Sequence, residues 1–156
     1  MKILLVSLSN RGGGASRATQ NLADSFYNSK INFELIIFEG EKIHGCSTKI
    51  LDNWFDTFVF RLINKIFFLF GFFLKNPSKD LRSFNIFPTK LLNLINTSYA
   101  DIVHLHWIGA EMISIKQLSQ INKPIVWSLH DGWIFNGTYH INPKEFYPLI
   151  NRFNNP

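Results

Sequence analysis

Four short apolar runs, each followed by glycine or polar residues, organise this chain of 156 residues. They are residues 2–8, 33–38, 101–106 and 125–129, and they are rich in Ile, Leu, Val and Phe. Runs of this length and composition are typical of strands buried in a parallel sheet. Helical spacing of apolar positions predicts helices after Ser16 up to residue 28, over residues 88–97 and over residues 111–120. The pattern therefore predicts an α/β fold: a Rossmann-like parallel sheet with flanking helices.

The length of the chain limits the domain organisation to one domain of ordinary size. We expect residues 1–140 to form this Rossmann-like domain. Residues 141–156 contain three prolines and no strong periodicity, and they read as a truncated tail or as the start of an interdomain region. Any mechanism that needs two domains must therefore take the second from elsewhere.

Residues 54–74 differ from the rest because they are mostly aromatic or aliphatic with a narrow polar face. Residues 61–90 contain six basic residues and one acidic residue. Their net charge of +5 equals that of the whole chain. Two interpretations remain open: a helix packed on the sheet, or a helix half-sunk in the interface of an anionic membrane. The uninterrupted apolar run of residues 66–74 is far below the ~20 residues of a membrane-spanning helix.

Cysteine usage and the amino terminus bear on the compartment. Cys46 is the one cysteine, so no internal disulfide can form, which fits a reducing environment. Polar residues at positions 7, 9, 10 and 11 interrupt the first apolar run before a signal-peptide core could form. We therefore expect a cytoplasmic protein.

Gly12, Gly13 and Gly14 follow the first strand and precede the first helix. Glycines allow backbone amides to approach an anion closely, and the helix N-terminus favours negative charge at the same place. The loop predicts a phosphate or sugar-phosphate site, although a plain turn would give the same pattern. A dinucleotide fingerprint would need glycine where Arg17 stands, whereas Glu39 is placed as a ribose-binding acid would be. The NAD hypothesis is thus weakened but open.

Two histidines, His106 and His130, stand where the later strands end, and ligands of open α/β sheets bind at such ends. His104 lies two residues before His106, in mid-strand, and is expected to be a hydrogen-bonded core residue. With Asp131, the three histidines could also form the metal site of a hydrolase. The nearby Trp107 and Trp133 could stack on a sugar or cap the core.

Three segments carry a resemblance to a known family: residues 12–18, residues 101–108 and residues 123–133. In this order they resemble the N-terminal domain of family-4 retaining glycosyltransferases, in the bacterial polysaccharide branch typified by colanic-acid and capsule synthesis. The resemblance implies the acceptor-side lobe of a GT-B fold, in which two Rossmann-like lobes face each other across a cleft. It covers most of residues 1–140.

The resemblance also implies roles for individual residues. His130 would be the catalytic residue that contacts the donor sugar near the reacting carbon. The donor phosphates would lie at Gly12, Gly13, Gly14 and Arg17. The acceptor side of the cleft would be lined by His106, Trp107, Asp131 and Trp133. A nucleotide-sugar would be the donor substrate, and neither a metal nor another cofactor is expected.

This sequence departs from the family in two respects. Residues 135–140 differ from the glycine, cysteine and histidine turn that is usual in this branch, and no two glutamates have the eight-residue separation found in the family's donor lobe. We therefore expect the acceptor-side half of such an enzyme, inactive without a donor lobe. Its expected partners are the nucleotide-sugar, a glycan or lipid-linked acceptor, an anionic membrane surface at the inner face of the plasma membrane and a separate donor-lobe polypeptide, but no nucleic acid. The alternative is a non-catalytic nucleotide- or phosphate-binding module.

Overall fold

A computed structural model of the chain describes residues 1–40, 47–50, 83–136 and 140, together with residues 58, 61–63, 65, 66 and 69. These residues form a five-stranded, all-parallel sheet with the order β3-β2-β1-β4-β5. The strands are β1 (Lys2–Ser9), β2 (Asn32–Glu39), β3 (Ser47–Ile50), β4 (Ile102–His106) and β5 (Ile125–Ser128). The helices are α1 (Gly14–Asn28), α3 (Leu91–Thr97), α4 (Ile115–Leu118) and α5 (Trp133–Asn136). The fold is therefore α/β and Rossmann-like, as the sequence pattern predicted.

The direction of strand addition reverses at β1. The chain builds β2 and β3 on one side of β1 and then returns to place β4 and β5 on the other side. Register fixes this centre, because Ser7 of β1 is paired with Ile37 of β2 and with His106 of β4. A reversal of this kind opens a crevice at the carboxyl ends of the central strands.

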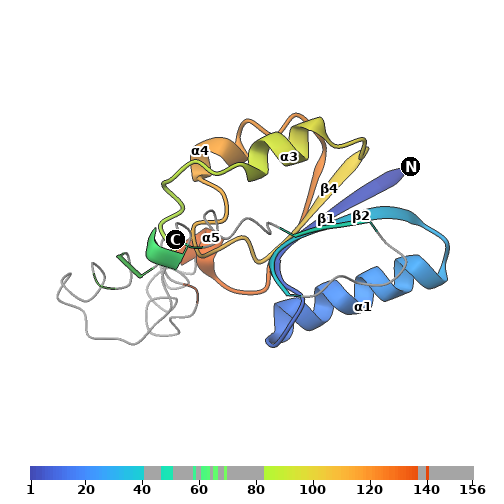
Figure 1. The fold of residues 1–156 in the computed structure, drawn as a ribbon, viewed down its shortest axis with the longest axis horizontal. Helices are drawn as coiled ribbons and strands as arrows, with labels where there is room; N and C mark the ends of the chain where they lie inside the picture. Colours follow the sequence, from blue (N-terminus) through green and yellow to red (C-terminus); the bar gives the residue numbers. More distant parts are fainter. Residues whose placement is uncertain are drawn as a thin grey trace, which may run out of the picture.

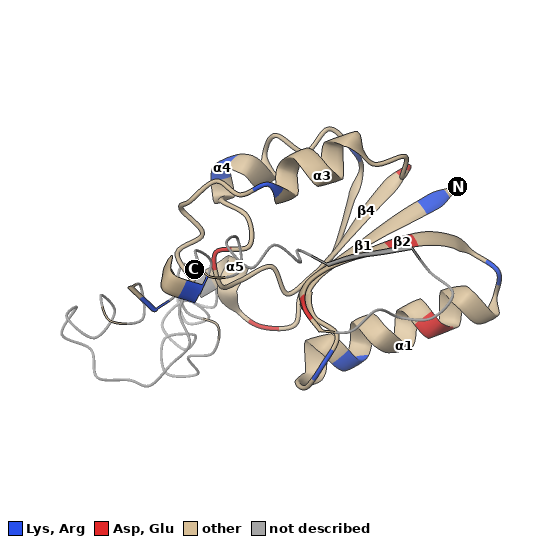
Figure 2. Cartoon of the chain, viewed as in Figure 1, with Lys and Arg blue, Asp and Glu red and all other residues tan. Residues whose placement is uncertain are grey.

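Helix α1 covers one face of the sheet, and α3 and α4 lie on the other (Figure 1). Under α1, a compact apolar cluster joins Ala23 of the helix to Leu5, Leu35 and Ile37 of β1 and β2. The opposite face holds a larger cluster, which includes Leu4, Val6, Ile36, Leu91, Ile95, Val103, Leu105, Met112 and Trp133. Lys and Arg of the described residues are spread over both faces (Figure 2).

Three helices differ from the prediction at their beginnings, and of these α3 begins at Leu91 instead of residue 88. Helix α1 starts at Gly14 with Gly13 as its N-cap, so Ser16 lies inside the helix and does not cap it. Helix α4 is confined to Ile115–Leu118, although the pattern predicted a helix over residues 111–120. The reason is that Glu111 has a φ of 58°, outside the helical region, and Ser114 forms a capping box with Gln117 that sets the start of the helix.

The predicted helix over residues 54–74 is described in part, and every described residue of it is helical. Among the described residues, no helix combines the length and the apolar character that crossing a bilayer requires. The expectation for residues 141–156 lies outside the described residues.

Candidate functional site at the carboxyl edge of the sheet

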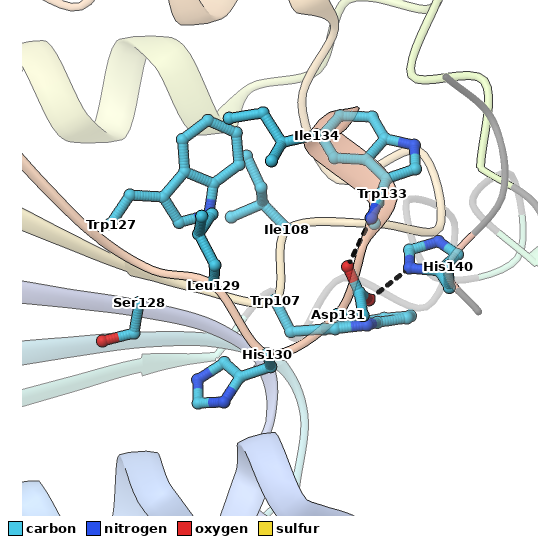
Figure 3. A pocket seen from close by; sticks show the side chains of 11 residues that line it. Trp107, Ile108, Trp127, Ser128, Leu129, His130, Asp131, Trp133, Ile134 and His140 are labelled. Atoms are coloured by element: carbon cyan, nitrogen blue, oxygen red, sulfur yellow. Dashed lines mark hydrogen bonds and ion pairs between the residues drawn. The ribbon is translucent and has the colours of Figure 1, made fainter. Parts of the chain in front are cut away.

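The strand register brings three predicted site segments to one edge of the sheet. His106, the last residue of β4, pairs with Ser7 of β1 on one side and with Ser128 of β5 on the other. The glycine loop follows β1 and His130 follows β5, so both leave the sheet at this same edge. Figure 3 shows His130 on the side of the sheet where α1 lies. The edge thus collects Gly12–14, His106 and His130, as the sequence predicted.

The glycine loop has the backbone and the space that an anion site requires. Gly12 and Gly13 have φ values of 68° and 56°, in the left-handed region that favours glycine. A Cβ added at Gly12, Gly13 or Gly14 would meet no atom within 4 Å, so open space lies beside all three. No side chain caps α1, and its first turn holds no acidic residue. The exposed Arg17 adds a cation to this turn.

His104 and His106 of β4 form a row with His130, the second residue after β5, on the α1 side of the sheet. The rings of His104 and His106 are 4.3 Å apart, and those of His106 and His130 are 5.2 Å apart. His106 Nδ1 lies 3.0 Å from His130 Nε2, and His104 Nε2 lies 2.9 Å from the Oγ of Ser128. The hydrogen bond expected for His104 is therefore present, although its ring is half-buried and does not belong to the core.

Burial controls the charge of this row. It lowers the pKa of His106 to about 4, helped by repulsion from any charge on His104 and His130. The pKa of His104 is also lowered, mainly by burial and then by His130. Both rings are therefore neutral at pH 7. His106 is 2% exposed, and its Nε2 has no hydrogen-bond partner among the described residues.

Asp131 is held by its own neighbours. Its Oδ1 accepts a hydrogen bond from the Trp133 backbone at 3.0 Å, and its Oδ2 accepts one from Nδ1 of His140 (Figure 3). The other nitrogen of His140, Nε2, lies 2.6 Å from the Oγ of Ser83. A neutral His140 that donates from Nδ1 to Asp131 has a bare Nε2, so the Ser83 O–H donates to it, while the Ser83 oxygen accepts the Ala110 N–H at 2.6 Å.

This carboxylate, imidazole and hydroxyl stand in the order of a hydrolase triad, but the surroundings give them a structural role. Ser83 is 2% exposed, and its hydroxyl already accepts a backbone N–H. A Cβ at Gly109 would come within 2.9 Å of that hydroxyl, so the Gly109 backbone packs closely against it. The network instead ties the loop after β4, the segment before α3 and the loop after β5 together.

The two tryptophans of the predicted acceptor cleft differ in position. Trp133 is buried in the larger core, and its Nε1 donates to the Ser83 carbonyl at 2.8 Å. Trp107 is half-buried, and its ring lies 4.9 Å from that of His140. Both line a small hollow with His130 and Asp131 (Figure 3). Trp133 therefore caps the core and also reaches the hollow.

Sequence reasoning missed Glu111, which is buried in the loop after β4. Its Oε1 accepts the backbone N–H groups of Phe84 and Asn85, and its Oε2 accepts that of Ile86. The side chain of Asn85 bonds back to the backbone of Ile108 and Glu111. The available signal was a single glutamate between apolar residues, which is typical of a buried, hydrogen-bonded carboxylate. It was not recognised because Glu111 was assigned to the start of a predicted helix.

Other predicted features are placed less centrally. Glu39 ends β2, is exposed, and forms an ion pair with Arg61 at 3.6 Å. Within the described ranges, no three His, Cys, Asp or Glu side chains converge as metal ligands would. Comparison of the chain with family models, with curated proteins and with solved structures yields no match.

Proposed function

We propose that this protein is the acceptor-side lobe of a retaining, nucleotide-sugar-dependent glycosyltransferase of cell-surface polysaccharide synthesis. It would transfer sugar only together with a donor-binding lobe, in a longer form of the chain or on a separate polypeptide. The observation that supports this proposal is the shared edge: the open glycine loop follows β1 and His130 follows β5, and these parallel strands flank β4 and end at the same edge of the sheet.

The roles follow from the chemistry of each group. The backbone amides at Gly12, Gly13 and Gly14, with Arg17 beside them, would receive the donor diphosphate. His130 would contact the donor sugar, and His106, Trp107, Asp131 and Trp133 would shape the acceptor side. Charge that develops on the leaving diphosphate would be stabilised by these amides and by Arg17, without a metal or another cofactor.

Nucleotide binding by the whole chain tests the loop. Gly13→Val places a β-branched side chain into the open space beside the loop, and we expect it to abolish the binding of a nucleoside diphosphate measured by calorimetry. Lys30→Val is the matched control, because Lys30 also has a φ of 56° but lies beyond the other end of α1. Equal losses in both variants would mean that helix strain, and not the loop, is responsible.

Turnover separates the proposal from its alternative, a non-catalytic nucleotide- or phosphate-binding module. The chain is incubated with a panel of nucleotide-sugars, alone and after addition of a family-4 donor lobe. We expect transfer only in the presence of the donor lobe, and its loss with His130→Ala. Nucleotide binding without transfer under either condition would favour the module, and robust transfer by the chain alone would contradict the two-lobe requirement.

The described part of the helix at residues 58–69 supports an anionic membrane as a partner. Phe58, Leu62, Ile66 and Leu69 recur at helical spacing and are each about half exposed, and the exposed Arg61 and Lys65 lie beside them. An apolar stripe flanked by cations matches the interface of an anionic bilayer. The Arg61–Glu39 pair brings this helix near the carboxyl end of β2, which is the edge that holds the site. The protein would thus be cytoplasmic and peripheral at the inner face of the plasma membrane, with the site near a lipid-linked acceptor.

Vesicle co-sedimentation tests this membrane contact. We expect binding to vesicles that contain anionic lipid, weaker binding in high salt, and loss of binding with Leu62→Glu. The matched control is Tyr99→Glu, which changes an exposed side chain before β4, at the opposite edge of the sheet. Binding that ignores salt and lipid charge would remove the membrane from the proposal.

A further inference from the structure

One buried nitrogen in the histidine row has no hydrogen-bond partner among the described residues, and it constrains where the protons are. His106 is buried, its Nδ1 shares a hydrogen bond with Nε2 of His130 at 3.0 Å, and its Nε2 has no partner among the described residues. A neutral imidazole carries one N–H donor and one bare acceptor nitrogen. The bond between the two rings therefore has two arrangements, which differ in the ring that donates.

In the first arrangement, His106 donates from Nδ1 and its buried Nε2 is bare. In the second, His130 donates from Nε2, so a neutral His106 must carry its proton on the buried Nε2, where the N–H finds no acceptor. Buried N–H groups without an acceptor are rarer in proteins than buried acceptors that lack a donor. The first arrangement is therefore the stable one.

We infer that His106 is a positioning residue that holds His130 as a neutral imidazole with its proton on Nδ1. The bare Nε2 of His130 is then occupied by the bond from His106, and the Nδ1–H is the group left for a ligand. No described residue forms a hydrogen bond with that nitrogen, and the His130 side chain is exposed at the carboxyl edge on the α1 side (Figure 3). His130 therefore presents a hydrogen-bond donor to an incoming molecule.

The inference assigns a ligand chemistry to this position, and here it rests on the proposed function. A fixed N–H donor recognises an oxygen acceptor, such as a hydroxyl, ring or phosphate oxygen of a nucleotide-sugar. It cannot serve as a general base, because its bare nitrogen already accepts from His106. The prediction is thus that His130 orients and stabilises the bound sugar and does not remove a proton.

Nuclear magnetic resonance of the whole chain tests the proton positions without any substrate. Long-range proton–nitrogen correlation of the 15N-labelled protein at neutral pH distinguishes the two tautomers of each histidine, and His130→Ala assigns the signals. We expect the Nδ1–H form for both His106 and His130. An Nε2–H or doubly protonated His130 in the unmodified protein would overturn the inference.

Two variants separate positioning from general packing. His106→Leu removes the donor, and we expect His130 to leave the Nδ1–H form. His106→Asn places an amide nitrogen near the position of Nδ1, and we expect it to restore that form. Persistence of the Nδ1–H form in His106→Leu would refute the positioning role. If His106→Leu does not fold, the tautomers of His130 in the unmodified protein and in His106→Asn test the positioning role. The samples contain no nucleotide, so a failure of sugar transfer would not change the tautomer result. A failure of the tautomer prediction would likewise leave the sugar-transfer proposal standing.

Discussion

The two halves of one sheet face differ in what covers them. On the α1 side, β1 and β2 present Leu5, Leu35 and Ile37, each 0% exposed beneath the helix. Leu5 is paired with His104, so β4 and β5 continue the same face beyond the helix. There the side chains are His104, Val126 and Ser128, and Val126 is 48% exposed.

The comparison shows how one sheet separates stability from chemistry. Where α1 covers the face, apolar side chains are buried completely and contribute the hydrophobic stabilisation of that layer. Where cover by the described residues ends, polar and titratable side chains reach the edge: His104 and Ser128 are half-buried and His130 is exposed, whereas His106 is 2% exposed. The histidine row lies on this open half, next to the loop that begins α1. The candidate site therefore lies where cover by α1 ends and the side chains of this sheet face change from Leu and Ile to His and Ser.

The largest expected effect is a difference in stability between the two halves. Leu35→Ala removes a side chain with no exposed area and leaves a cavity under α1, which costs about 2–5 kcal/mol of unfolding free energy. Val126→Ala, on the open half, is expected to cost less than about 0.5 kcal/mol, because much of its side chain stays in water. Urea denaturation of both variants measures the difference. Similar losses would mean that the open half is covered in solution.

Acid is expected to weaken the fold through the open half. His106 has a pKa of about 4 in the folded chain, whereas the unperturbed value is 6.5. Between pH 4 and pH 6.5 its side chain is therefore protonated in the unfolded chain and neutral in the folded chain. Stability contributed by the neutral ring is therefore complete above pH 6.5 and declines as the pH falls to 4. The loss amounts to roughly 3 kcal/mol at about 1.4 kcal/mol for each pKa unit.

His106→Leu provides the control for this acid effect. Denaturation curves at several pH values are compared for both proteins, so that carboxylates titrating in the same range cancel. We expect the variant to lose less stability than the unmodified protein between pH 6.5 and pH 4. Parallel pH profiles would show that His106 takes up its proton in the folded state.

The sequence predicted β1, β2, β4 and β5 because their signal is local, but it did not predict the short β3. Apolar runs near residues 2–8 and 125–129, each followed by glycine or histidine, define strands and their ends without any knowledge of neighbours. The shared edge followed from the parallel connections alone. The burial of His106 did not follow, because it depends on the neighbouring strands β1 and β5. His140 and Ser83 are 57 positions apart, and neither has a local pattern that indicates the hydrogen bond between them.

Both carboxylate oxygens of the buried Glu111 accept hydrogen bonds, whereas Nε2 of the buried His106 has no partner among the described residues. Glu111→Gln keeps the volume but turns one acceptor oxygen into a donor facing the backbone N–H groups of residues 84–86. We expect a loss of about 2 kcal/mol by chemical denaturation, because bonds to a charged acceptor contribute more than neutral ones. Glu34→Gln, in a half-buried carboxylate paired with Lys2, is the control and should lose less.

The smallest expected effect comes from the hydrogen bond that crosses the open half between β4 and β5. Ser128→Ala removes the hydroxyl 2.9 Å from His104 Nε2, and a neutral bond at a half-exposed position contributes about 1 kcal/mol. Ser119→Ala, whose exposed hydroxyl bonds only to the local Lys116 carbonyl, should stay within about 0.5 kcal/mol of the unmodified protein. Equal values for the two serines would mean that water replaces Ser128 as the partner of His104. In that case the open half would be held by its strand pairing alone, and its side chains would be free to serve a ligand.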